Sequence, residues 1–132
     1  MCVQSGTDMP RTYVILSTDG TDAMREALAE ALAGVPYELV TAASGPEVLV
    51  RAHEARPDLI LLDLELPVVG GLRVLELLGA DTGTAAIPVV ALDSAGGDAE
   101  AARALAAGAA FYLQKPVPAD EARAVIRRLL VP

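Results

Sequence analysis

Two charged residues follow short apolar runs, and a carboxylate and an ammonium of this kind could act together in a reaction. Asp63 follows Leu59-Ile60-Leu61-Leu62, and Lys115 comes just after the run that ends at Leu113. A carboxylate can act as a nucleophile, and a flexible ammonium beside it can contact a phosphoryl group in a way that arginine does not reproduce. Lys115 is the single lysine among ten Lys and Arg residues. The alternative interpretation is structural: Asp63 is a turn residue, and Lys115 is a lysine exposed to solvent.

Further polar residues follow the other apolar runs. Ser17-Thr18-Asp19 follows the first run, and Asp93-Ser94 follows the fourth. In open parallel sheets, ligands bind at the carboxyl ends of the strands, near the point where the strand order reverses. We therefore expect these residues, Asp63 and Lys115 to converge at one edge of a sheet.

The elements that would position these residues are short apolar runs alternating with stretches of helical periodicity. This pattern predicts repeated βα units, with most strands buried on both faces. It predicts an α/β fold of the flavodoxin-like type: a five-stranded parallel sheet in the order 2-1-3-4-5, with helices on both faces. The expected strands are Tyr13–Leu16, Tyr37–Val40, Leu59–Leu62, Pro88–Leu92 and Ala110–Leu113.

The expected helices have recognisable starts and stops. Ser44 and Glu47 form a capping-box pattern for a helix that ends before Arg56-Pro57. Gly34 ends the helix that precedes it. The first helix carries apolar residues from Met24 to Leu32, and the last three are expected at Gly71–Leu78, Asp98–Ala107 and Ala119–Leu130.

Composition limits the class of protein. The 132 residues carry a formal net charge of −8, and 53% are hydrophobic, so we expect one packed domain over residues 12–130 after a disordered lead at residues 1–11. The acidic balance and the few aromatic residues argue against nucleic-acid binding. The single cysteine and the lack of a signal peptide or membrane span favour a cytoplasmic protein that binds no membrane.

Three stretches resemble the receiver domain of two-component response regulators. They are Arg56–Pro67 continuing to Gly70-Gly71-Leu72, then Ile87–Leu92, then Ala106–Pro116. The resemblance covers about residues 12–130. It implies that Asp63 is the phosphoacceptor, that Lys115 contacts the phosphoryl group, and that Tyr112 moves between two states. It also implies the main-chain carbonyl of Glu65 as a metal ligand and a cis bond before Pro116.

The resemblance also implies a function. The domain would accept a phosphoryl group on Asp63 from a histidine kinase or a phosphotransfer protein. It would then change its binding to a downstream protein, or to its own kind, through the fourth helix, fifth strand and fifth helix. The domain would not be an enzyme beyond phosphorylating and dephosphorylating itself, and no organic cofactor is expected. Arg103, Tyr112, Arg123 and Arg127 are the candidates for display on that surface.

The sequence departs from the family pattern after the first strand. Receivers usually carry two adjacent acids there, but this chain has Ser17-Thr18-Asp19-Gly20. If the strand sets the register, Ser17 and Thr18 take the acid positions; if the following helix sets it, Asp19 and Gly20 do. Neither register supplies two carboxylates. With Asp19, Asp63 and the Glu65 carbonyl as the candidate ligands, Mg²⁺ binding is expected to be weak or absent.

A second departure follows the fourth strand. Asp93 stands where receivers usually have a hydroxyl that links phosphorylation to the movement of Tyr112. An ionised carboxylate cannot donate that hydrogen bond. The Ser94 hydroxyl could donate it only if the chain were shifted by one residue relative to the family pattern. We hypothesise that Asp93 pairs with Lys115 and holds the domain in one state without phosphate. Gly70 also departs from the usual Asp or Asn.

Three other functions fit parts of the sequence. A pseudo-receiver would keep the fold and bind proteins without phosphorylation. A flavodoxin-like electron carrier would bind FMN phosphate at the hydroxyl-rich loop Ser17–Thr21, but this leaves Asp63 and Lys115 unexplained. A phosphohydrolase of the haloacid-dehalogenase type would use Asp63 as nucleophile and Glu65 as acid. That family usually has Asp at the second position and a longer chain.

Overall fold

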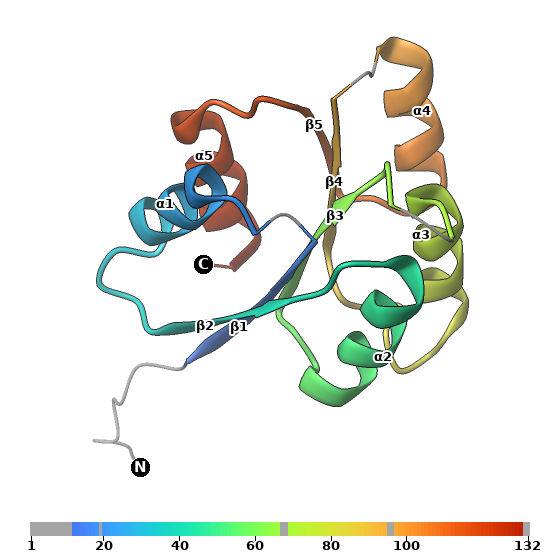
Figure 1. Cartoon of the computed structure of the whole chain (residues 1–132), viewed down its shortest axis with the longest axis horizontal. Helices are drawn as coiled ribbons and strands as arrows, with labels where there is room; N and C mark the ends of the chain where they lie inside the picture. Colours follow the sequence, from blue (N-terminus) through green and yellow to red (C-terminus); the bar gives the residue numbers. More distant parts are fainter. Residues whose placement is uncertain (1–11, 19, 67–68, 95–96, 131–132) are drawn as a thin grey trace.

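The computed structural model describes residues 12–18, 20–66, 69–94 and 97–130, and five strands alternate with five helices in these ranges (Figure 1). The expected disordered lead at residues 1–11 lies outside the described residues. The elements are β1 (Tyr13–Ser17), α1 (Asp22–Ala31), β2 (Tyr37–Thr41), α2 (Gly45–Ala55), β3 (Leu59–Asp63), α3 (Gly71–Ala80), β4 (Val89–Asp93), α4 (Asp98–Ala106), β5 (Phe111–Gln114) and α5 (Ala119–Leu130).

The sheet confirms the predicted topology. The strand order is β2-β1-β3-β4-β5, and every neighbouring pair is parallel. Helices α1 and α5 cover one face, while α2, α3 and α4 cover the other (Figure 1). The first four residues of β3 and all of β4 are buried, because helices cover both faces of these strands.

Two apolar cores lie on the two sides of the sheet. Leu28 of α1 and Ile126 of α5 belong to the core on one face, together with Leu61 of β3. Val48 of α2 and Val74 of α3 belong to the core on the other face. Burial of these aliphatic side chains is the main force that holds the helices on the sheet, and it fixes where each strand ends.

Helices α1 and α2 begin at side-chain caps. The Oγ of Ser44 accepts from the Glu47 backbone N–H at 3.3 Å, as the capping pattern predicts. The Glu47 carboxylate accepts from the Ala43 N–H at 2.6 Å, and this bond holds the pKa of Glu47 below its usual value. Thr21 caps α1 by accepting from the Met24 N–H, a cap that the sequence analysis did not identify.

The loop after β3 turns closely because position 71 is glycine. A Cβ at Gly71 would clash with the Cα of Leu64 and would lie 2.7 Å from the carbonyl oxygen of Asp63. The Gly71 N–H also donates to the Leu64 carbonyl at 3.2 Å. The start of α3 is thereby packed against the end of β3, directly beside Asp63.

The ladder of backbone hydrogen bonds continues past the strand ends. Leu64 N–H donates to the Leu92 carbonyl, and Lys115 N–H donates to the Asp93 carbonyl, each at 2.8 Å. The peptide bond between Lys115 and Pro116 is cis, as the family resemblance implies. Asp63, Asp93 and Lys115 therefore stand at one edge of the sheet, on three adjacent strands or just beyond them.

Candidate functional site

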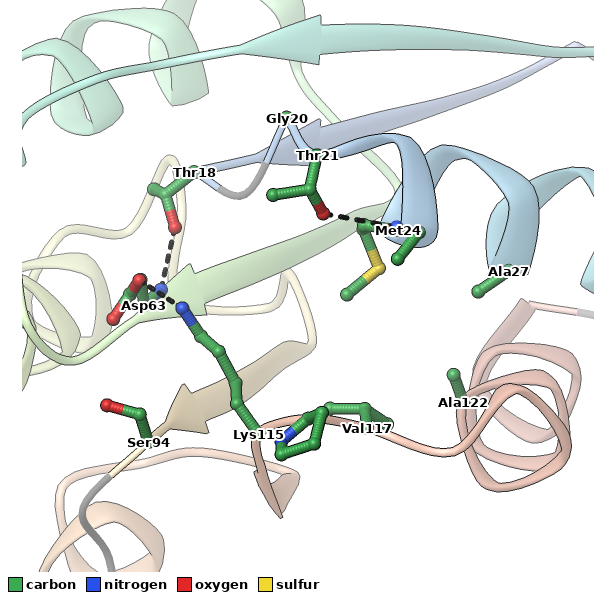
Figure 2. A pocket seen from close by; sticks show the side chains of 12 residues that line it. Thr18, Gly20, Thr21, Met24, Ala27, Asp63, Ser94, Lys115, Val117 and Ala122 are labelled. Atoms are coloured by element: carbon green, nitrogen blue, oxygen red, sulfur yellow. Dashed lines mark hydrogen bonds and ion pairs between the residues drawn. The ribbon is translucent and has the colours of Figure 1, made fainter.

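Asp63 and Lys115 meet at the carboxyl edge of the sheet. The Nζ of Lys115 lies 2.6 Å from the Oδ2 of Asp63, and the two side chains are 25% and 19% exposed. Both line an open pocket of about 570 Å³ that extends between α1 and the start of α5 (Figure 2). The predicted convergence of this carboxylate and this ammonium is confirmed, and the pair remains accessible to a small molecule.

Backbone groups hold the Asp63 carboxylate in place. Its other oxygen, Oδ1, accepts from the Glu65 N–H at 2.8 Å. The backbone N–H of Asp63 donates to the Oγ1 of Thr18 at 2.7 Å (Figure 2). Thr18 itself is tied to β3, because its N–H donates to the Leu61 carbonyl at 3.0 Å. Asp63 thus has a defined orientation toward the pocket.

Thr18 lies beside Asp63 at the end of β1, and which residues take the family's acid positions stays a prediction. β1 ends at the buried Ser17, and Thr18 follows with its hydroxyl against the backbone of Asp63. The sequence predicted that Thr18 lies at the same edge of the sheet as Asp63, but it did not predict this hydrogen bond. Asp19 lies outside the described residues, so its role as a metal ligand stays a prediction.

Asp93 is paired with Tyr112. Asp93 is only 6% exposed, and its Oδ2 accepts a hydrogen bond from the Tyr112 hydroxyl at 3.1 Å. Burial of the phenol, together with this hydrogen bond, raises the pKa of Tyr112. The sequence analysis placed Asp93 beside Lys115 and did not foresee its contact with Tyr112.

Ser94 contacts Glu65 across the mouth of the site. The Ser94 hydroxyl donates to the Oε1 of Glu65 at 2.6 Å, and the Ser94 N–H donates to the same oxygen at 3.3 Å. Ser94 also lines the pocket that contains Asp63. The side chain of Glu65 therefore links the loops after β3 and β4, which the sequence analysis did not predict. The metal-ligand role given to the Glu65 carbonyl stays a prediction.

The described residues do not fit a magnesium site. Within the described ranges, no group of three or more His, Cys, Asp or Glu side chains could hold a metal ion. Mg²⁺ prefers oxygen ligands that include carboxylates in octahedral geometry. Here one Asp63 oxygen contacts an ammonium, the other contacts a backbone N–H, and the nearby Thr18 hydroxyl is neutral. No chemical step is therefore assigned to a metal.

Two arginines expected on the partner surface contact other groups of the same chain. Arg127 donates through Nη1 to the Ala31 carbonyl at 3.0 Å, so it ties α5 to the end of α1. Arg103 pairs with Glu100 on the surface of α4. Leu105 of α4 is 49% exposed. Arg127 is exposed as well as bonded to α1, and its display on the α4, β5 and α5 surface stays a prediction.

The doubly wound sheet and the carboxylate–ammonium pair at its carboxyl edge define a receiver-type α/β domain. Residues 15–127 match the family model of the response regulator receiver domain, and the chain belongs to this family. It is 34% identical over 116 residues to the DNA-binding response regulator MtrA of Mycobacterium tuberculosis, covering 88% of this chain and 50% of the relative. It is 35% identical over 122 residues to the regulator RpaA of Synechocystis, covering 92% and 49%. The chain spans about half the length of these curated relatives.

Solved structures agree with this assignment. A response regulator of Chloroflexus aurantiacus superposes with a TM-score of 0.79 at 28% identity, covering 92% of this chain and 100% of the other. The chemotaxis response regulator CheY4 of Vibrio cholerae gives a TM-score of 0.76 at 26% identity, with 91% and 100% covered. This chain therefore holds a receiver domain of two-component systems, a family whose members are generally not enzymes. These matches favour the receiver interpretation over the flavin carrier and the phosphohydrolase.

The helices in the described ranges are too short or too polar to cross a membrane.

Proposed function

We propose that Asp63 accepts a phosphoryl group from a histidine kinase or a phosphotransfer protein and that this changes the binding of a downstream protein. The observation that carries the proposal is the 2.6 Å contact between Asp63 and Lys115 in an open pocket. A carboxylate held beside an ammonium is suited to in-line attack on phosphorus, because the ammonium balances the negative charge that the incoming phosphoryl group brings.

The transfer is balanced without any further reactant. An oxygen of Asp63 forms a bond to phosphorus while the P–N bond of the phosphohistidine breaks. The electron pair of that bond goes to the imidazole nitrogen, which then takes a proton from water. The product is an acyl phosphate on Asp63. Lys115 would turn from the free carboxylate to the phosphoryl oxygens, since its flexible stem places three donors within reach.

Intact-mass spectrometry tests this proposal directly. The protein is incubated with acetyl phosphate or phosphoramidate, with and without Mg²⁺, and we expect one added phosphoryl group. Asp63→Asn should abolish the addition, whereas Asp98→Asn, which changes an exposed acid at the start of α4, should not. Replacing Lys115 with methionine should slow the addition by a factor on the order of 10². Absence of any added phosphoryl group, with circular dichroism showing a folded protein, would refute the proposal.

A second candidate, a receiver that binds its partners without phosphorylation, is favoured by the hydrogen bond between Asp93 and Tyr112. Tyr112 lies on the strand that the family uses for partner binding, and its hydroxyl donates to the Asp93 carboxylate, a group of this chain. Under this proposal, amide NMR signals of β5 and α4 should be the same in wild type and Asp63→Asn, before and after phosphoramidate treatment. Donor-dependent shifts at Tyr112 that require Asp63 would exclude it.

A further inference from the structure

We infer that the Thr18 hydroxyl and the Lys115 ammonium together replace a divalent cation at this site, so that Asp63 is oriented and charge-balanced with no metal bound. The inference rests on the proposed function only for its chemical consequence. Its structural part depends on contacts that are already described: Thr18 with the Asp63 backbone, and Lys115 with the Asp63 carboxylate.

Thr18 does the orienting. Its Oγ1 lies 2.7 Å from the Asp63 nitrogen and accepts that N–H. The hydroxyl hydrogen points to the Leu61 carbonyl, 3.4 Å away. Both ends of this hydroxyl therefore contact the backbone of β3. A hydroxyl used in this way brings no negative charge and has little capacity left to ligate a cation.

Lys115 supplies the charge. Its Nζ is 2.6 Å from Asp63 Oδ2, and the two side chains are 25% and 19% exposed. A divalent ion bound to the same carboxylate would lie near the ammonium, and the two cations would repel each other. Since the carboxylate is already neutralised, the electrostatic gain that normally drives metal binding is reduced.

Two consequences follow for the wild-type protein. First, Mg²⁺ should not stabilise the fold, because a ligand that does not bind the native state cannot shift the unfolding equilibrium. Second, phosphoryl transfer from phosphoramidate to Asp63 should proceed equally well in EDTA and in Mg²⁺. In that transfer the P–N bond of phosphoramidate breaks, the P–O bond to Asp63 forms, and ammonia leaves with a proton from water.

Metal binding is measured without any phosphoryl donor. Thermal unfolding of the full chain is compared in MgCl₂ and in KCl of equal ionic strength. We expect no difference in Tm for wild type and for Thr18→Val, which keeps the shape but removes the hydroxyl. Thr18→Asp should gain a Mg²⁺-dependent rise in Tm, because it places a second carboxylate next to Asp63. A rise in the wild-type Tm, or no rise for a folded Thr18→Asp, overturns the inference.

A second measurement does not depend on any variant folding. Substoichiometric Mn²⁺ is added to wild-type protein labelled with ¹⁵N, and paramagnetic broadening is followed at the amides of Thr18, Asp63 and Lys115. We expect these signals to be broadened no more than exposed amides at the far end of the sheet. Selective broadening at the three residues overturns the inference.

The phosphorylation experiment separates this inference from the proposed function. Rates in EDTA and in Mg²⁺ that agree within about twofold support both. Phosphorylation that occurs only in Mg²⁺ overturns the inference and leaves the proposed function standing. Absence of phosphorylation in both media overturns the proposed function, while unchanged Tm and unbroadened Mn²⁺ spectra still support the metal-free site.

Discussion

Removal of the Tyr112 hydroxyl tests how strongly Asp93 holds this side chain. Asp93 is 6% exposed and accepts from Tyr112 at 3.1 Å. Hydrogen bonds to charged groups contribute about 1.5–3 kcal/mol. Because Tyr112 is only partly buried, water can partly replace the lost donor, and we expect Tyr112→Phe to lower the free energy of unfolding by about 1.5–2 kcal/mol. At about 2.1 cal/mol/K per residue, this corresponds to a fall in Tm of about 5–7 °C.

The assay is thermal unfolding followed by circular dichroism at 222 nm, since the chain has no tryptophan. Tyr37→Phe is the matched control, because the described part of the chain shows no hydrogen bond from the Tyr37 hydroxyl. Its effect should stay within about 0.5 kcal/mol. The reasoning is refuted if Tyr112→Phe shifts Tm no more than this control does.

A double-mutant cycle assigns the effect to the pair. Asp93→Asn alone removes the charge and disturbs every contact of that carboxylate. In the background of Asp93→Asn, the further change Tyr112→Phe should cost at least about 1 kcal/mol less than it costs in wild type. Equal costs in the two backgrounds would show that the hydroxyl is stabilised by something other than Asp93.

Three further predictions concern packing, pH and capping. Gly71→Ala should destabilise the domain by about 1–3 kcal/mol, because the added Cβ would clash with Leu64. Gly79→Ala in α3 should stabilise the domain by about 0.5–1 kcal/mol, because its Cβ would have no atom within 4 Å. Urea unfolding measures both changes. The raised pKa of Tyr112 means that the folded state holds this proton more tightly. The stability that this protonated hydroxyl contributes is therefore complete below its ordinary pKa of 10.0 and is lost as the pH rises through the folded-state pKa. Urea midpoints measured in alkaline buffers should show this decline for wild type and not for Tyr112→Phe. Ser44→Ala should cost about 1 kcal/mol in the same urea assay.

The fold was predictable because its signals are local and mutually consistent. Apolar runs of the right length alternate with helical periodicity, and this pattern leaves few topologies open. The expected strands end within a residue or two of the observed ones. For β1, for example, the expected end is Leu16 and the observed end is Ser17. The meeting of Asp63 and Lys115 follows from the same topology, because parallel strands bring their carboxyl ends to one edge.

The partners of individual side chains were harder to predict, because several polar groups compete at that edge. Topology places backbones, but it does not say which hydroxyl a carboxylate contacts. Thr18 illustrates the limit: its place after β1 was predicted, but its bond to the Asp63 nitrogen depends on the path of the chain beyond the strand. The bond between Glu65 and Ser94 likewise joins two loops whose shapes no periodicity determines.

Strand alternation contains the signal that would have placed Asp63 and Asp93 on opposite faces of the sheet. Asp63 is two residues after Leu61, so it faces the same side of the sheet as Leu61, which packs against α1 and α5. Lys115 is two residues after Leu113, which belongs to the same core. Asp93 is two residues after Ala91, so it faces the other side of the sheet, where Ala91 and Tyr112 belong to the second core.

The Asp63–Lys115 pair and the Asp93–Tyr112 pair therefore belong to opposite faces of the sheet. A backbone hydrogen bond connects the two pairs, because the Asp93 carbonyl accepts from the Lys115 N–H at 2.8 Å. If phosphorylation of Asp63 acts on Tyr112, a movement of Lys115 has a direct route to it through this hydrogen bond and the ends of β4 and β5. If Lys115 moves in this way on phosphorylation, the rate of hydrogen exchange at its amide should change together with the exchange rate at the Tyr112 amide.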